Sequence, residues 1–492
     1  MYPNLYYVFK DWFGIEWQWL KILNTFGLFV AMAFLVSAIV ISAELKRKEK
    51  QGLLQPSEEV IIVGKPASIL ELIFNGFVGF VFGAKILGLI FSKLPETNTQ
   101  EYIFSKHGSL LGGLAMAAVL VYVKWKEKNS QKLKVPERRT VRIWPHDRVG
   151  DIIILGLIFG ILGAKLFDNF EHWDVFLNDP IGQLFSVSGL TFYGGLILAS
   201  IAICFYGYKK GITLSYLVDS AAPTLMIAYA VGRIGCQVSG DGDWGVYNSA
   251  YTSDASGKLA LAAPGDFENA INKNETFFLQ GTIVNAAGKI VLVTDRTYAT
   301  KADIPHRYWK GVSFLPKWFF AYSYPQNVNN DGVPMTAVIE EHYSVLPMPV
   351  FPTPLYETII CTLLFLLLWA IRKKIKTPFL MFGIYLILNG IERFVIEIVR
   401  VNKQYAVGAS SLSQAQEIAV GLVIAGVLLV IYAKVIILRV NKKLRIKEED
   451  ETTNNDELRN NEELIKKEET INNEATINND ASINNEASIK KL

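Results

Sequence analysis

The stretch of residues 232–245 reads GRIGCQVSGDGDWG and has residue types suited to chemistry on a charged ligand. Arg233 stands among glycines and small polar residues, and two carboxylates, Asp241 and Asp243, follow it. A guanidinium stays charged and can hold a phosphate through two parallel hydrogen bonds. Backbone N–H groups in a glycine-rich turn are further anion donors. The stretch therefore predicts a site for a phosphate-bearing ligand, and the hydropathy described below makes a phospholipid the simplest candidate.

Polar residues around position 393 repeat with a helical period. Four of them are separated by four, four and three positions, so a helix would place all of them on one face. Charges inside apolar segments are costly in a bilayer and usually face a cavity or a partner. These residues predict either the wall of a polar site or buried ion pairs that tie helices together. They are Asn389, Arg393, Glu397 and Arg400, and Glu357 opens a neighbouring apolar segment.

The elements that must position these residues are membrane helices. The chain of 492 residues is 51% hydrophobic and 19% charged, whereas soluble domains carry about 25% charge. Its apolar residues form runs of about 20, the length that crosses the ~30 Å hydrocarbon core. We expect an all-α polytopic membrane protein with about nine transmembrane helices. Their expected ranges are 19–42, 67–92, 108–124, 149–167, 188–207, 217–236, 355–371, 378–400 and 415–438.

The connections between these runs alternate in charge. Basic clusters follow the first, third, fifth, seventh and ninth runs; the first cluster lies at 46–50, and Lys209 and Lys210 follow the fifth run. Cytoplasmic connections carry an excess of lysine and arginine. The alternation therefore predicts an N-terminus outside the cell and, after nine crossings, a cytoplasmic C-terminus.

Two segments do not have the composition of membrane helices. Residues 240–350 are polar, with alternating apolar stretches and Asn, Asp and Gly turns, which favours a small β-rich insertion on the outer, periplasmic side. Residues 447–492 are of low complexity, with an INNEAT-like hexad repeated three times, and this composition predicts a disordered cytoplasmic tail. The predicted organisation is therefore helices one to six in 1–239, the insertion in 240–350, helices seven to nine in 351–446, and the tail.

The sequence also contains an internal echo. FGAKILGLIF at 82–91 resembles LGAKLF at 162–167, and FSKHGSLLGGL at 104–114 resembles FSVSGLTFYGGL at 185–196. The second and third predicted helices thus look like a copy of the fourth and fifth, as is common in membrane proteins. The alternative is convergence on glycine-rich helix packing.

Composition argues against several other classes of function. A net charge of +3 does not indicate nucleic acid as a partner. Three cysteines, all in or beside apolar runs, argue against a disulfide framework or a cysteine-rich metal site. We therefore expect no metal and no cofactor.

Several pieces of this chain resemble the prolipoprotein diacylglyceryl transferase family. Residues 232–245 are similar to its signature G-R-x-G-N-x-x-x-G-E. Five further pieces follow the order of the family motifs. These are Phe-Gly at 26–27, GLTFYGGLI at 189–197, DSAAP at 219–223, PTPLYE at 352–357 and ERFVIEIVR at 392–400.

The resemblance implies transfer of a diacylglyceryl group from phosphatidylglycerol to the lipobox cysteine thiol of a preprolipoprotein, in the bacterial inner membrane. It implies that Arg233 and Arg393 stabilise the departing phosphate and that Asp241 helps to orient them. Tyr193 occupies the position of the family histidine. The implied substrate-binding residues are Arg233, Gly232, Gly235, Gly240, Glu357, Tyr356, Glu397 and Arg400.

The chain departs from the family pattern at several motif positions. Tyr193 replaces a histidine, Cys236 an asparagine and Asp241 a glutamate, and one extra residue precedes Trp244. A phenol with a pKa near 10 is a poor base at neutral pH, so Tyr193 is expected to position lipid, and His107 is an alternative base. The departures leave open a catalytically inactive relative. A transporter or channel for a small anion is a further alternative, although clustering of the charges at the outer helix ends favours surface chemistry.

Overall fold

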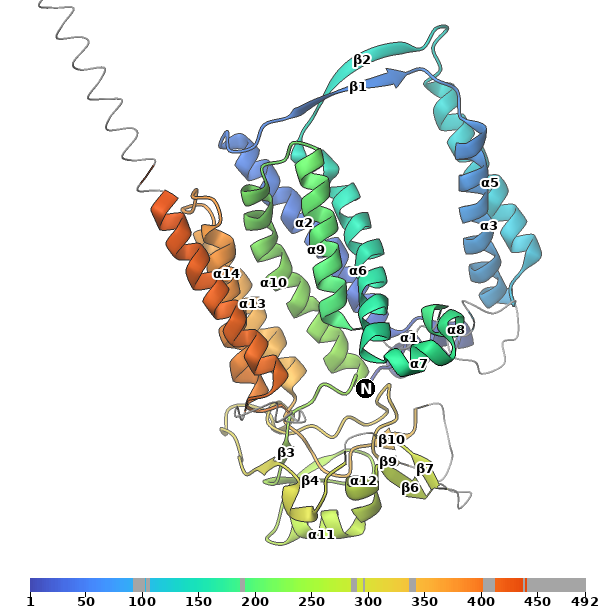
Figure 1. Cartoon of the computed structure of the whole chain (residues 1–492). Coiled ribbons are helices and arrows are strands. Elements are labelled where there is room, and N and C mark those ends of the chain that lie inside the picture. The colour runs from blue at the N-terminus through green and yellow to red at the C-terminus, as the bar shows by residue number, and fades with distance from the viewer. Residues whose placement is uncertain are drawn as a thin grey trace, which may run out of the picture. The chain divides into compact units, whose positions relative to one another are not determined.

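The computed structural model describes residues 1–91, 102, 107–185, 191–284, 290–294, 297–335, 342–400, 412–436 and 439. Most of these residues are helical (Figure 1). Helix α10 (Leu214–Ser239) packs against α2 (Thr25–Lys50), α13 (Thr353–Ile371) and α14 (Leu380–Glu397). Arg233 lies on α10 and therefore on the helix that contacts all three of the others.

Two helix pairs have the same internal packing. They are α3 (Ile69–Phe91) with α5 (Leu110–Ser130), and α6 (Val149–Glu171) with α9 (Phe192–Lys209). A Cβ on Gly83 would lie 2.4 Å from the carbonyl oxygen of Gly112, and one on Gly163 would lie 2.4 Å from that of Gly194. The contacts explain why glycine recurs at matching positions of the echo, because only glycine allows this approach.

The chain reaches α3 and leaves α5 through an antiparallel ribbon of β1 (Ser57–Val63) and β2 (Glu137–Ile143), in which Ser57 is paired with Ile143. Arg148, just before α6, donates to Ser57 Oγ (2.9 Å) and Glu59 Oε1 (2.8 Å) and ties the ribbon to that helix. Short helical elements complete the first half of the chain. These are α1 (Leu5–Phe13), η1 (Gln18–Ile22), η2 (Pro145–Arg148), α7 (Trp173–Asn178) and α8 (Pro180–Phe185).

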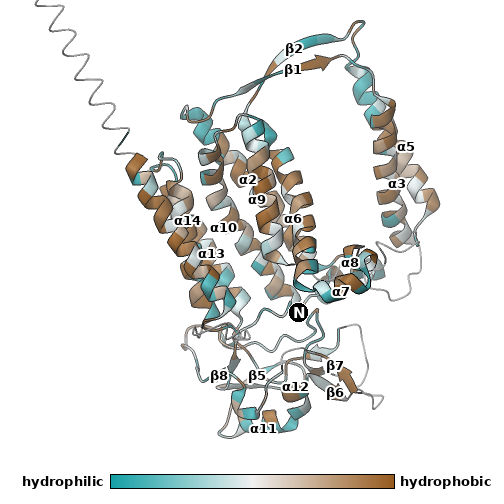
Figure 2. Ribbon diagram, viewed as in Figure 1, coloured by the Kyte–Doolittle hydropathy of each residue, from teal (hydrophilic) through white to brown (hydrophobic). Residues whose placement is uncertain are grey.

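Seven helices of the described chain are long and apolar enough to cross a membrane, and the ribbon in Figure 2 shows that they consist largely of hydrophobic residues. The chain is thus a mostly helical, multi-pass membrane protein. Two of the nine expected helices, at 108–124 and 378–400, form as α5 and α14. Toward their C-terminal ends α5 carries four charged residues and α14 carries three, so their composition alone does not mark them as spans. The seven are Thr25–Lys50, Ile69–Leu89, Pro145–Glu171, Phe192–Lys209, Leu214–Ser239, Thr353–Ile371 and Gln414–Ile436.

The inserted segment is held by a core of aromatic and aliphatic side chains rather than by one sheet. Its strands are two or three residues long and form separate two-stranded pairs, so the expected β-rich domain is not confirmed. Turn residues interrupt the apolar alternation; Gly281, for example, ends a helix in the left-handed region at φ 67°. The elements are β3 (Tyr247–Asn248), β4 (Tyr251–Ser253), β5 (Leu259–Leu261), α11 (Asp266–Lys273), α12 (Glu275–Gln280), β6 (Thr282–Val284), β7 (Ile290–Leu292), η3 (Lys301–Asp303), β8 (His306–Arg307), η4 (Lys317–Phe319), β9 (Val333–Pro334) and β10 (Ser344–Val345).

The last described helix, Gln414–Ile436, packs closely on α14. A Cβ on Gly390 would lie 2.7 Å from the carbonyl oxygen of Ala419, and one on Gly426 would lie 2.7 Å from that of Gly383. A second compact unit begins at Leu429. The predicted tail at 447–492 lies outside the described residues.

Candidate active site

The C-terminal end of α10 begins the site. The helix ends at Gly240, which adopts φ 70° and whose N–H donates to the carbonyl oxygen of Cys236 (3.0 Å). A Cβ on Gly240 would lie 2.8 Å from Cβ of Asn327, so both the backbone angle and the available space call for glycine. Gly242 also has a positive φ, of 78°. The chain therefore turns sharply after α10 and brings residues 241–245 back toward Arg233.

Asp243 lies between two arginines that are far apart in the sequence. One carboxylate oxygen accepts from Arg233 Nη1 and the other accepts from Arg400 Nη2. The turn itself is fixed, because Thr353 Oγ1 donates to the carbonyl oxygen of Asp243 (2.6 Å) and the N–H of Gly245 donates to that of Phe351 (2.8 Å). Asp243 is thus a clamp that joins the end of α10 to the residues just after α14.

Glu357, on the second turn of α13, is a second shared carboxylate. Its side chain is fully buried and lies within ion-pair distance of three guanidiniums: Oε2 is 3.1 Å from Arg233 Nε, and Oε1 is 3.4 Å from Arg393 Nη1 and 3.8 Å from Arg400 Nη1. Tyr229, one helical turn before Arg233, also donates to Oε1 (2.8 Å). Asp243 and Glu357 thus hold three arginines together, and we call this group the arginine cluster. The arginines are Arg233 on α10, Arg393 on α14 and Arg400 just after α14.

Glu397 completes the arginine cluster on α14. Its Oε2 lies 3.2 Å from Arg393 Nη2, and its Oε1 accepts from Ser413 Oγ (2.9 Å) at the start of the last helix. The spacing of four residues between Arg393 and Glu397 therefore places both side chains in the cluster, as the helical period predicts. Three arginines then face three carboxylates, those of Asp243, Glu357 and Glu397.

The arginine cluster still has donors for a ligand. A guanidinium has five N–H groups, and within the described residues the polar contacts of Arg233 use Nε and Nη1. The ring of Tyr229 lies beside its guanidinium carbon, at 5.1 Å, and holds the planar group in place. A phosphate can therefore bind to Nη2 without breaking either ion pair of Arg233.

The two carboxylates of the turn differ in protonation. Burial would raise the pKa of Asp243, but the charges of Arg233 and Arg400 outweigh it and hold the pKa at about 2. Burial, together with the nearby charge of Asp243, raises the pKa of Asp241 to about 6, against the opposing charge of Arg233. Asp241 Oδ2 accepts from the Cys236 thiol over 3.9 Å. Asp243 is therefore a permanently charged clamp, whereas Asp241 can take up or release a proton near neutral pH.

The structure places some of the expected residues away from the arginine cluster. Tyr193 lies in the first turn of α9 with its ring edge-on to Phe192, and no hydrogen bond or ion pair joins it to the three arginines within the described ranges. Tyr356 donates to the carbonyl oxygen of Phe319 (2.7 Å) in the inserted segment. The backbone oxygen of His107 accepts from Lys85 (2.8 Å) in the α3–α5 pair.

Among the three glycines expected in the site, the contacts differ. A Cβ on Gly235 would lie 2.9 Å from Cβ of Phe29 on α2, so this glycine permits close packing of α10 on α2. A Cβ on Gly232 would meet no atom within 4 Å. Only Gly240 shapes the turn that carries the two carboxylates.

Two residues of the arginine cluster were not predicted from the sequence. Asp243 stands in the signature stretch but was not among the expected site residues, because the acidic position of the family signature falls on Asp241. Tyr229 could have been found from its spacing of four residues before Arg233 on the same helix. No group of three metal-ligating side chains occurs among the residues that the structure describes.

Comparison with known proteins gives consistent matches. The family model described as "Prolipoprotein diacylglyceryl transferase" matches residues 130–432, more than half of the chain, and this range includes the whole arginine cluster. The phosphatidylglycerol–prolipoprotein diacylglyceryl transferase of Leptospira interrogans is 26% identical over 277 residues, covering 51% of this chain and 61% of the relative. The protein of the same name from Enterococcus faecalis is 32% identical over 184 residues, covering 36% of this chain and 62% of the relative.

A third relative with this name, from Dehalococcoides mccartyi, is 28% identical over 151 residues, covering 30% of this chain and 54% of the relative. The chain thus spans between about half and two thirds of the length of these relatives. The extent of the family match decides the assignment: this chain belongs to the prolipoprotein diacylglyceryl transferase family.

Proposed function

We propose that this chain transfers the diacylglyceryl group of phosphatidylglycerol to the lipobox cysteine thiol of a preprolipoprotein, the first step of lipoprotein maturation. The family match and the names of the relatives support this reaction. The observation that carries it is the arginine cluster, in which Asp243 and Glu357 hold three guanidiniums at one end of the helix bundle. Such a cluster suits a phosphate-bearing lipid, because guanidiniums bind phosphate with two parallel hydrogen bonds.

The topology is part of the proposal. Nine crossings, including α5 and α14, place the arginine cluster and the inserted segment on the outer face of a bacterial inner membrane, with the N-terminus outside and the C-terminus in the cytoplasm. The alternation of basic connections supports this orientation. The cluster then lies level with the headgroups of the outer leaflet, where phosphatidylglycerol and the exported signal peptide of a preprolipoprotein can both reach it.

In the reaction, the substrate thiol loses its proton, and the thiolate attacks the glycerol carbon that carries the phosphate. A carbon–sulfur bond forms, the carbon–oxygen bond to the phosphate breaks, and glycerol phosphate leaves with the bonding electron pair. The thiolate is the nucleophilic form. Asp241 is proposed to accept the proton, since its pKa of about 6 leaves it ionised at neutral pH. Tyr193 and Tyr356 are proposed to line the path of the lipid.

The arginines stabilise the charge that develops on the departing phosphate. Arg233 and Arg393 are proposed to contact it directly, while Asp243 and Glu357 hold the guanidiniums in place before the reaction begins. In acyl-transfer enzymes, removing a single preorganised donor lowers kcat by about 10²–10³-fold. Arg400 and Glu397 are proposed to position the other members through their ion pairs.

The proposal can be tested in cells depleted of their own diacylglyceryl transferase. Lipidation of a reporter lipoprotein is followed with the wild-type chain, with Arg233→Ala and with Arg139→Ala, a control on the exposed face of the β-ribbon. Rescue by the wild type and the control, but not by Arg233→Ala, is expected. Equal rescue by Arg233→Ala would refute the role of the arginine, and no rescue by the wild type would refute the reaction.

A further inference from the structure

The inserted segment contains a stretch that combines exposed aromatic rings with cations. In residues 307–319, here called the aromatic segment, five large apolar side chains are between 41% and 81% exposed. Arg307, Lys310 and Lys317 are exposed among them. Lys310 Nζ also lies 5.7 Å from the ring of Tyr308. The exposed apolar residues are Tyr308, Trp309, Val312, Phe314 and Trp318.

The backbone of the aromatic segment is fixed rather than loosely attached. Asn248, which is buried, donates to the carbonyl oxygens of Trp309 (2.9 Å) and Phe320 (3.0 Å) and accepts from the N–H of Trp309 (3.2 Å). The carbonyl oxygen of Lys310 accepts from Tyr251 (2.7 Å). The backbone that carries the exposed rings is therefore fixed to the rest of the inserted segment.

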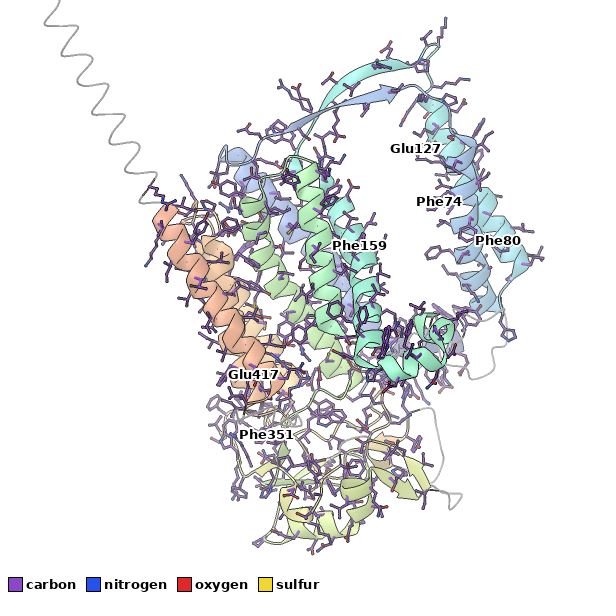
Figure 3. The ribbon with its side chains drawn as sticks, in the orientation of Figure 1. Phe74, Phe80, Glu127, Phe159, Phe351 and Glu417 are labelled. Carbon is purple, nitrogen blue, oxygen red and sulfur yellow. The ribbon has the colours of Figure 1, made fainter. Side chains whose placement is uncertain are left out.

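Both ends of the aromatic segment are joined to ends of membrane-type helices. Arg307 Nη2 donates to the carbonyl oxygen of Ile398 (3.2 Å), just after α14, and Phe319 accepts from Tyr356 (2.7 Å) on the first turn of α13. Trp309 also stacks on Phe351, labelled in Figure 3, which lies two residues before α13. Both ends of the aromatic segment, together with Trp309, thus lie beside the ends of α13 and α14.

We propose that the aromatic segment is a membrane-interface anchor that inserts its rings among the headgroups of an anionic outer leaflet. Tryptophan and tyrosine are enriched at this depth because one part of each ring is apolar and the other polar. Lysine and arginine are attracted to an anionic membrane surface, so the three cations favour phosphatidylglycerol over a zwitterionic lipid. The proposal rests on the outward orientation described above, but it does not depend on catalysis.

The anchor also has a consequence for the proposed reaction. It gathers anionic phospholipid next to the ends of α13 and α14, the same ends that carry Glu357 and Arg393. A peptide-binding surface is the competing interpretation of exposed rings. The lipid surface is favoured because the segment is joined to the membrane-spanning ends and carries three cations.

The test uses the full-length protein in lipid nanodiscs and a spin label at Phe314→Cys. A label at Asn269→Cys, an exposed position on α11, is the matched control. The wild-type protein, treated with the same label, measures the background from the native cysteines. Collision of the label with oxygen, which concentrates in the bilayer, is compared with collision with a water-soluble nickel chelate. We expect the oxygen-to-nickel ratio to be several-fold higher at 314 than at 269, and to rise with the fraction of phosphatidylglycerol.

A second variant tests the charges. With Lys310→Gln and Lys317→Gln in the Phe314→Cys background, the rise with phosphatidylglycerol should disappear while the label at 269 is unaffected. Equal oxygen-to-nickel ratios at 314 and 269 would overturn the anchor. A high ratio at 314 that does not change with the fraction of phosphatidylglycerol would overturn the preference for anionic lipid. A ratio that changes only when a lipobox peptide is added would assign the rings to a peptide instead. Because the readout needs no turnover, it stands apart from any failure of the proposed reaction.

Discussion

Buried charges occur at both ends of the helix bundle, but they are paired differently. At the end where α2 and α13 finish, Glu44 accepts from Arg372 (2.5 Å) and Arg47 (2.8 Å), Lys48 donates to the carbonyl oxygen of Tyr216 (2.8 Å), and Asp219 accepts the N–H of Phe382 (2.9 Å). We call this group the inner charge group. Its members lie on helices or cap a helix, so the group joins helix ends to one another.

At the other end, the arginine cluster depends on a turn. Asp243 lies outside any helix and is joined to Arg233 and Arg400, while Glu357 is shared among three guanidiniums. Shared carboxylates keep several cations together and leave some of their N–H groups for a ligand. Glu44 is likewise shared by two arginines, so a buried, shared carboxylate alone does not distinguish a binding site from a structural ion pair. The arginine cluster differs in the third guanidinium on Glu357 and in the glycine turn that carries Asp243.

The largest difference between the two groups should appear on replacing arginine by lysine. Arg233→Lys keeps the charge but loses the fork of parallel donors, so we expect kcat/KM to fall by about 10²–10³. Arg372→Lys in the inner charge group should leave kcat/KM of the folded protein near the wild-type value and lower its melting temperature. Initial rates on purified protein, measured with folding by size-exclusion chromatography, check both. A large rate loss in Arg372→Lys alone would reverse the assignment.

The next effect concerns the clamp. Asp243→Asn leaves Arg233 and Arg400 without their shared charge, and we expect activity to fall by about 10–100-fold, the value of a hydrogen bond to a charged group. Glu44→Gln is the matched change in the inner charge group and should affect thermal stability more than rate. If Asp243→Asn were as active as the wild type, the ion pairs of Asp243 would not be needed for activity. Asp241 would then have to hold the arginines.

A smaller effect, which depends on pH, should come from Asp241. A base acts only when deprotonated, so with a pKa of about 6 the rate should rise with pH through that value. It should be about tenfold lower at pH 5 than on the plateau above pH 7, since about one carboxyl in eleven is ionised at pH 5. Asp241→Asn should lower the plateau and remove this rise. An unchanged pH profile in the variant would exclude Asp241 as the proton acceptor.

The smallest effect is expected for Tyr193. Its ring packs on Phe192 and makes no hydrogen bond to the arginine cluster within the described residues. Tyr193→Phe should therefore change the rate by no more than about threefold, because it removes only a hydroxyl and keeps the ring that packs on Phe192. A loss as large as that of Arg233→Lys would show that the phenol takes part in the chemistry, and Phe192→Leu is the control for loss of ring packing alone.

Helical periodicity and apolar length predicted most of what positions the site. Arg393 and Glu397 meet because they are four residues apart on one helix, and the helix that contains Arg233 is recognisable from its hydropathy. The clamp could not be predicted in this way. After α10 the chain turns through two glycines with positive φ, Gly240 and Gly242, so the spacing of residues no longer determines which side chain points back.

The inserted segment was harder to predict for a related reason. Alternating apolar residues indicate strands, but strand length depends on partners distant in the sequence, such as the pairing of Tyr247 with His306. Its aromatic core replaces a continuous sheet. The internal echo was visible in the sequence, and the matching contacts of Gly83 and Gly163 give it a geometric counterpart, from which we propose that α3–α5 arose as a copy of α6–α9.

The most direct test of the central claim is a reaction with purified components. The detergent-solubilised chain is incubated with phosphatidylglycerol and a lipobox peptide, and the products are measured by mass spectrometry. The account predicts a peptide that has gained one diacylglyceryl group as a thioether, with one glycerol phosphate released per thioether, and loss of both products in Arg233→Lys. Absence of the thioether with the wild-type chain, or its formation at an equal rate in Arg233→Lys, would contradict the account.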